Sequence, residues 1–231
     1  MRRSLYPSRV TPHASRLLLV LLLAGCAVPQ VPSRVIYEDP VNFVRLEPDR
    51  AVLPELPESA HAHPFATTPE EVARVLRGLM VQEQRMWLHR WISGVAPKEE
   101  VFREDEIALL APWIATALSA ARPSEFVTFY LSRPESSIKR EITTGGLYVH
   151  QDELHIFLRN HRMVYGIPAH GMVYDRRYPT MSIAPKTFEM SFVPADAMIR
   201  LEPSVLGRML GGDKDELVID LKKVRAAKPV A

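Results

Sequence analysis

The chain has 231 residues but only one cysteine, Cys26. A single thiol excludes an intramolecular disulfide, a Cys-x-x-Cys redox pair and a zinc site built from several thiolates. It is consistent with an oxidising compartment, where spare thiols are rare. Stability must therefore come from a packed core, and the chain is long enough to bury one sizeable core.

The sequence also lacks the local signatures of common enzyme classes. It contains no Gly-x-Ser-x-Gly elbow, His-Glu-x-x-His motif, phosphate-binding glycine-rich loop or calcium loop. The acidic run at residues 211–216 lacks the ligand spacing of a calcium site and is interpreted as a solvated turn. These absences favour a non-catalytic protein, and no cofactor is expected, although an active site can form without a local motif.

A large excess of charge of one sign is absent too. The chain has 29 basic and 27 acidic residues, a formal net charge of +2. Four of the arginines lie within residues 1–25, so removal of that segment would leave 25 basic and 27 acidic residues, or −2. A basic stripe that could bind nucleic acid is missing, so nucleic acid is not expected as a partner.

The N-terminus has the order of parts found in a secretory signal peptide. Residues 1–16 carry the four arginines and no acid, residues 17–23 are apolar, and Ala24 and Gly25 are small. The apolar run is shorter than the about 20 residues that span a bilayer. An ordinary signal peptide with a chance cysteine, or a short membrane anchor, is the alternative.

Leu23-Ala24-Gly25-Cys26 resembles the lipobox of bacterial lipoproteins, and this resemblance covers residues 1–26 only. It implies that a diacylglyceryl group joins Cys26, that cleavage removes residues 1–25, and that the new α-amine is acylated, for example with palmitate. Two or three acyl chains anchor a protein stably, because each buried methylene contributes about 0.8 kcal/mol. Ala27 stands where an aspartate often retains such proteins at the inner membrane, so the resemblance implies the outer membrane, facing the periplasm.

Proline divides the remaining chain. Residues 26–66 are predicted to form a proline-rich extended tether, residues 67–225 a single domain and residues 226–231 a loose tail. The extended pieces at 35–37 and 43–46 have prolines beside them, which favours an edge position or docking on the domain surface. The tether either lifts the domain off the membrane or lies against it.

Two helices are predicted in the domain. The first has Thr68 as N-cap and Pro69 at the first helical position, and it ends near Gly78. Residues 80–93 are interpreted as a strand, with continuation of the helix as the alternative. The second helix covers residues 103–121, where Pro112 is expected to bend or split it.

Residues after this helix alternate with period two, as strands do. The predicted strands cover residues 126–131, 138–142, 147–158 as a hairpin, 187–193 and 216–224, with a turn or bulge at 143–146. Two helices followed by a run of strands predict an α+β fold with a mostly antiparallel sheet.

A long irregular stretch at residues 165–185 carries the first candidate binding residues, Tyr174, Arg176 and Arg177. Long loops are often functional, and aromatic residues with arginine are enriched at binding hot spots. The alternative is a packed loop that covers a sheet edge, with Arg176 or Arg177 paired to an acid. Trp87 and Trp91 could also anchor a partner or stack on a sugar, although core packing is the commoner role of tryptophan.

Seven histidines follow Cys26, and several could serve as metal ligands or acid–base groups. The candidate cluster comprises His150, Asp152, His155, His161 and His170. Its alternative is a set of histidines scattered over strands and loops. His61 and His63 could bind a metal weakly from the tether or could simply be exposed.

The sequence therefore predicts a lipid-anchored envelope lipoprotein that meets the membrane through Cys26 and binds or helps assemble a protein partner without catalysis. A periplasmic hydrolase or metal-binding protein that uses the histidine cluster is one alternative. A module that binds cell wall or a small apolar ligand is another.

Overall fold

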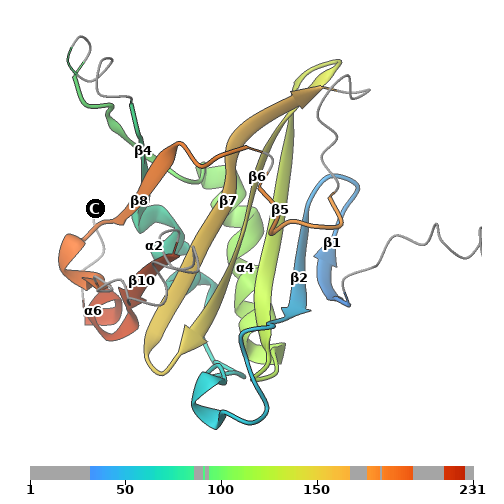
Figure 1. The fold of residues 1–231 in the computed structure, drawn as a ribbon, viewed down its shortest axis with the longest axis vertical. Helices are drawn as coiled ribbons and strands as arrows, with labels where there is room; N and C mark the ends of the chain where they lie inside the picture. The colour runs from blue at the N-terminus through green and yellow to red at the C-terminus, as the bar shows by residue number, and fades with distance from the viewer. Residues whose placement is uncertain are drawn as a thin grey trace, which may run out of the picture. The chain divides into compact units, whose positions relative to one another are not determined.

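A computed structural model describes residues 32–85, 91, 94–166, 176–182, 184–199 and 216–226. The chain divides into two compact units, Met1–Val31 and Pro32–Ala231, and every described residue belongs to the second. Within that part, two antiparallel sheets combine with three α-helices (Figure 1). The predicted α+β fold with a mostly antiparallel sheet is confirmed.

The larger sheet has seven strands in the order β1-β2-β5-β6-β7-β10-β9, and every neighbouring pair is antiparallel. In chain order these strands are β1 (Arg34–Glu38), β2 (Phe43–Pro48), β5 (Glu125–Ser136), β6 (Lys139–His150), β7 (Glu153–Gly166), β9 (Met198–Ile199) and β10 (Glu216–Asp220). The smaller sheet has the order β4-β3-β8, with β3 (Leu79–Glu83), β4 (Lys98–Glu100) and β8 (Phe188–Phe192). Single-turn 3₁₀ helices lie at Pro57–Ser59 and Ala195–Ala197.

Helix α2 (Pro69–Gly78) begins and ends as the sequence predicts. The Thr68 hydroxyl accepts the backbone N–H of Glu71, and Pro69 occupies the first turn. A Cβ on Gly78 would lie 2.4 Å from the Phe192 ring, so glycine permits β8 to approach the helix end. Strand β3 follows at once, which confirms the strand interpretation for residues 80–83, whereas residues 84 and 85 lie outside the strand and Trp91 is helical.

Helix α4 (Glu104–Ala120) runs through Pro112 without interruption, so the expected split is not observed. The proline removes a hydrogen bond to the carbonyl of Ala108, and both residues are exposed. Water can therefore solvate that carbonyl, which reduces the cost of the lost hydrogen bond. None of the described helices is long and apolar enough to cross a membrane.

Helices α2, α4 and α6 (Leu221–Ala226) cover one face of the large sheet, and α4 crosses behind it in Figure 1. The main core joins these helices to the inward side chains of β2, β5, β6, β7 and β10. It includes Leu46, Phe129, Leu147, Ile156 and Ile219, each at most 2 % exposed. The unit from Pro32 to Ala231 therefore contains its own core.

The predicted tether at residues 26–66 needs correction for residues 34–66. Strand β2 lies inside the large sheet, between β1 and β5, and Pro48 is tolerated because it is the last residue of the strand. The chain then docks along the domain: the N–H of His61 donates to Pro123 O (2.8 Å) and that of Ala62 to Val149 O (2.7 Å). Of the two alternatives for this segment, the structure has the docked one; the sequence does not decide between them, because these backbone partners are distant in the chain.

The C-terminal prediction also needs correction. Residues 216–220 form β10, but residues 221–226 form α6 instead of continuing the strand. The Asp220 carboxylate accepts the backbone N–H groups of Lys222 and Lys223, which caps a helix at that point. By contrast, the predicted bulge at 143–146 and hairpin at 147–158 are present in β6 and β7.

Candidate functional site

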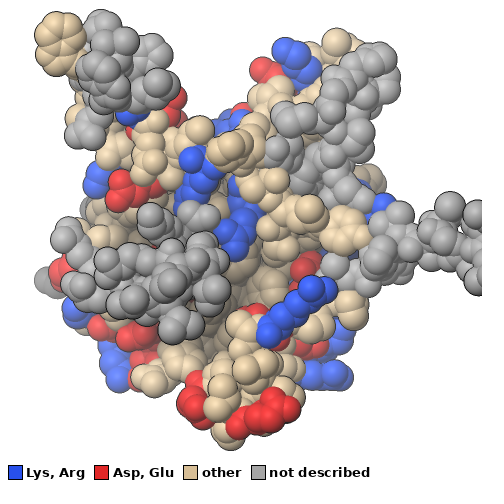
Figure 2. All heavy atoms as spheres, viewed as in Figure 1, with Lys and Arg blue, Asp and Glu red and all other residues tan. Residues whose placement is uncertain are grey.

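The large sheet has one face away from the helices, here called the open face, and Figure 2 looks onto it. Among the described residues, no helix of the main core packs on this side. Antiparallel sheets often expose one face to water, and outward positions are then mostly polar. Several outward positions here are aromatic instead, which makes this face the candidate site.

The part of the open face near β1 is closed by a second, smaller core. The rings of Phe43 and Tyr130 stack with centroids 5.2 Å apart, and Ile142 is fully buried beside them. The Arg45 guanidinium lies 4.0 Å from the Phe43 ring centroid, and that of Arg176 lies 5.6 Å from both ring centroids. This region is therefore packed rather than available.

Residues 176–182 cross this region of the large sheet (Figure 1). Arg176 fixes them there. Its guanidinium donates to the carbonyl of Pro40 (2.9 Å) and pairs with Glu38 (3.3 Å). Farther along, the buried side-chain amide of Asn160 donates to the carbonyl of Met181 (3.0 Å). These contacts agree with the alternative of a packed loop with Arg176 paired to an acid. The Arg177 guanidinium lies 5.9 Å from the Tyr178 ring centroid.

Farther from β1, the open face carries a half-buried aromatic row. The Phe126 and Phe157 rings lie 6.0 Å apart, and the Arg159 guanidinium is 4.7 Å from the Phe157 ring centroid. Gly146 makes this possible, because a Cβ there would meet the Phe157 ring at 2.6 Å. We call Phe126, Phe157 and Arg159 the aromatic row. Aromatic rings with arginine, partly exposed, have the composition of binding hot spots.

A second row of rings begins where residues 49–65 dock. His61 Nε2 lies 3.0 Å from Asp49 Oδ2, and its ring is 4.1 Å from that of Tyr148. The Tyr148 ring stacks on His155 at 4.7 Å, and His155 Nδ1 is 3.1 Å from Glu216 Oε1. His61 is only 6 % exposed, so the expectation that this histidine is exposed in a tether is wrong.

His63 is buried just beside this row. Its Nδ1 lies 2.9 Å from Glu125 O, and its Nε2 accepts the N–H of Val149 at 3.1 Å. Because a carbonyl needs a donor and an N–H needs an acceptor, the ring must be neutral, with its proton on Nδ1. Burial, with the nearby His61, lowers the pKa of His63 to about 4. His63 is therefore structural, which spacing alone did not reveal.

The described members of the predicted histidine cluster do not converge. The rings of His150 and His155 are 6.2 Å apart, but Asp152 pairs with Lys222. His161 is six residues beyond His155 in β7, about 20 Å along the strand, and its Nε2 lies 3.3 Å from Val101 O. Across the described ranges, no three His, Cys, Asp or Glu side chains could hold a metal ion. His170 lies outside the described residues.

The tryptophans differ in their surroundings. Trp91 is 84 % exposed, so core packing is wrong for this residue. Trp113 is half-buried and stacks on Tyr37 with ring centroids 4.9 Å apart. Trp87 and Tyr174 lie outside the described residues.

Acidic side chains gather at the tip of the molecule formed by residues 49–60 (Figure 2). Glu55 and Glu58 are exposed there, next to Leu53 and Leu56, which are each 45 % exposed. The aromatic row, in contrast, has arginine beside its rings. The two surfaces therefore differ in charge.

Comparison with known proteins gives no guide to this site. No family model matches the chain, and no curated protein or solved structure matches it either.

Proposed function

We propose that this chain is a lipid-anchored envelope lipoprotein, facing the periplasm from the outer membrane, whose domain binds an envelope protein without catalysis. The observation that carries the anchor is the sequence Leu23-Ala24-Gly25-Cys26, placed directly after a basic segment and a short apolar run. The binding role is supported by the aromatic row, where Phe126 and Phe157 are half-buried on a face that usually carries polar side chains.

Cys26→Ser is expected to abolish lipidation in a bacterial host and to leave an unprocessed precursor, because serine offers no thiol to the diacylglyceryl group. Labelling of cells with an alkyne analogue of palmitate, followed by mass spectrometry of the N-terminus, measures both effects. Ala24→Ser keeps a small residue before the cysteine and should still be labelled. A mature wild-type chain that begins at Cys26 without a lipid would contradict the anchor.

A photoreactive benzoylphenylalanine in place of Phe157 is expected to form a discrete adduct with one envelope protein in cells, since this position lies in the aromatic row. The same probe in place of Trp91 tests a tryptophan that is 84 % exposed. Ser119, exposed on the outer side of α4, provides the matched control and should form no such adduct. Identical adducts at positions 157 and 119, or none at 157, would count against a partner at the open face, and an adduct at 91 alone would move the partner to the connection between β3 and β4.

A further inference from the structure

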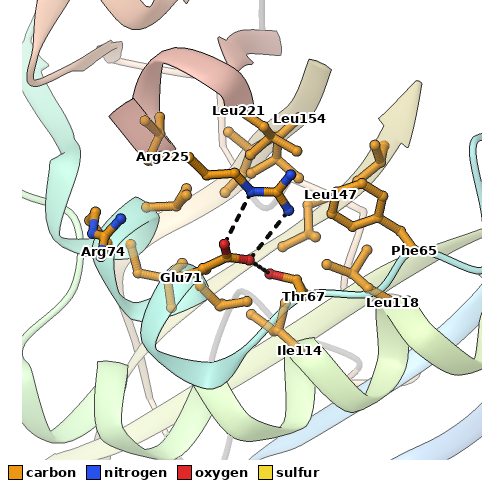
Figure 3. Close-up of a pocket in the computed structure, with 16 residues that line it drawn as sticks. Phe65, Thr67, Glu71, Arg74, Ile114, Leu118, Leu147, Leu154, Leu221 and Arg225 are labelled. Carbon is orange, nitrogen blue, oxygen red and sulfur yellow. Dashed lines mark hydrogen bonds and ion pairs between the residues drawn. The ribbon is translucent and has the colours of Figure 1, made fainter. Parts of the chain in front are cut away.

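An apolar cavity lies on the other side of the large sheet, between its inner face and helices α2, α4 and α6 (Figure 3). Its walls include Val72, Leu76, Ile114, Leu147, Ile156 and Val224. The space inside is about 30 Å³. That volume holds a water-sized group, but a cavity with such a lining offers water no partner. The cavity therefore suits an apolar group.

The rim of this cavity is polar and includes a connected set of three side chains (Figure 3). The Arg225 guanidinium donates to both carboxylate oxygens of Glu71, at 3.1 and 3.3 Å, and the Thr67 hydroxyl donates to Glu71 at 2.8 Å. Arg74 lies one turn along α2 from Glu71 and also lines the cavity. Two arginines and one glutamate give the rim a net positive charge, which favours an anionic group.

Helix α6 is the wall that can move most easily. It has six residues and inserts two apolar side chains, Leu221 and Val224, into the core. Its side-chain ion pairs, Arg225 with Glu71 and Lys222 with Asp152, are solvent-exposed, and such pairs contribute little to stability. The opposite walls belong to the longer elements α2, α4, β6 and β7, which pack on one another.

The apolar walls of the cavity that face α6 are short. Ile114 and Leu118 are one turn apart on α4, about 6 Å, and Leu147 and Val149 are two residues apart on β6, about 7 Å. A chain of this length matches the first few carbons of an acyl group rather than a sterol or a whole lipid. An acyl chain needs more than the present space, so α6 must shift outward to admit it.

We propose that this cavity binds the first few carbons of a single acyl chain, next to an anionic head group that replaces Glu71 as the partner of Arg225. The carboxylate of a fatty acid and the phosphate of a phospholipid share this chemistry. The site needs neither the lipid anchor nor the protein partner of the proposed function. Its test can therefore succeed or fail independently of them.

The test uses residues 32–231, the unit that contains the whole core, titrated with dodecanoate below its micelle concentration and followed by calorimetry. Saturable binding is expected, and dodecyltrimethylammonium, with the same chain and the opposite charge, should bind at least tenfold more weakly. Arg225→Gln should weaken dodecanoate binding about tenfold, because it removes a charge-assisted pair. Arg77→Gln is the matched control: Arg77 also pairs with a glutamate, Glu104, but does not line the cavity, so affinity should be unchanged.

Two further measurements keep the result interpretable. Val149→Ile adds a methylene to the cavity wall and should weaken binding even if Arg225→Gln perturbs folding. Amide exchange in residues 221–226 should increase when dodecanoate binds. A second titration with dihexanoyl phosphatidylglycerol identifies the source: binding supports a phospholipid, and binding of dodecanoate alone supports a free fatty acid. No saturable binding of either, or equal affinity in wild type, Arg225→Gln and Val149→Ile, would overturn the site.

Discussion

His63→Leu is expected to lower the free energy of unfolding at pH 7 by about 3 kcal/mol, because it leaves two buried backbone groups without partners. These groups are the N–H of Val149 and the carbonyl of Glu125, which His63 bridges in the folded protein. The side chain is 5 % exposed, so water cannot readily replace it. Urea unfolding of residues 32–231, followed by circular dichroism, measures the loss.

The same histidine makes stability depend on pH. Its pKa in the folded protein is about 4, against an ordinary value of 6.5, because it is buried and lies beside His61. Between these pH values the unfolded chain binds more protons, so stability falls as the pH decreases from 6.5 towards 4. The complete loss is about 3 kcal/mol for one such group. Burial, with the neighbouring Arg162, lowers the pKa of His161 to about 4 as well, and it acts in the same direction.

The pH profile of His63→Leu should therefore be flatter than that of the wild type, with the remaining slope due largely to His161. His150→Gln is the control, because His150 bridges no such pair of buried backbone groups in the described hydrogen bonds. It should keep the wild-type slope. A slope in His63→Leu as steep as that of the wild type would show that the neutral bridge assigned to His63 is incorrect.

Gly145→Ala is expected to destabilise the protein by about 3 kcal/mol, the upper end of the usual cost of overpacking. Gly145 lies in the bulged part of β6, where a Cβ would be 2.2 Å from the carbonyl oxygen of Phe157 and 3.0 Å from the Phe129 ring. The nearer atom belongs to the backbone of β7, so no side-chain rotation relieves the contact. The two strands must separate in the middle of the sheet.

Gly94→Ala provides the comparison for this substitution. Gly94 has φ +71°, which alanine adopts with a local cost of about 1 kcal/mol, but a Cβ there meets no atom within 4 Å. Thermal unfolding of both variants should therefore show a much larger decrease in Tm for Gly145→Ala. Equal small decreases would mean that β6 and β7 pack less closely than the structure has them.

Local sequence patterns are sufficient to predict much of the secondary structure. The cap at Thr68, the alternation of residues 126–131 and the hairpin at 147–158 depend on neighbours within a few residues. Such patterns determine local conformation because the hydrogen bonds and side-chain spacing that produce it are local. The α+β class follows from the order of these elements.

Contacts between residues distant in the chain decide the features that local patterns do not predict. Residues 49–65 look like a tether because proline is frequent there, yet they dock through backbone groups of α4, β6 and the connection between α4 and β5. The sequence predicts Arg176 as a candidate binding residue, but only the fold pairs it with Glu38, which is 138 residues away. Likewise, His63 and Phe157 acquire their roles from Val149 and Gly146.

The sequence by itself therefore determined helices α2 and α4, strands β5 to β8 and the lipobox-like stretch at Cys26, because each depends on adjacent residues. Only the tertiary structure decided which side chains are buried, which are paired and which form the aromatic row or the cavity under α6. The physical reason is that burial and pairing depend on contacts between elements far apart in the chain, and a single sequence does not encode those contacts in any local pattern.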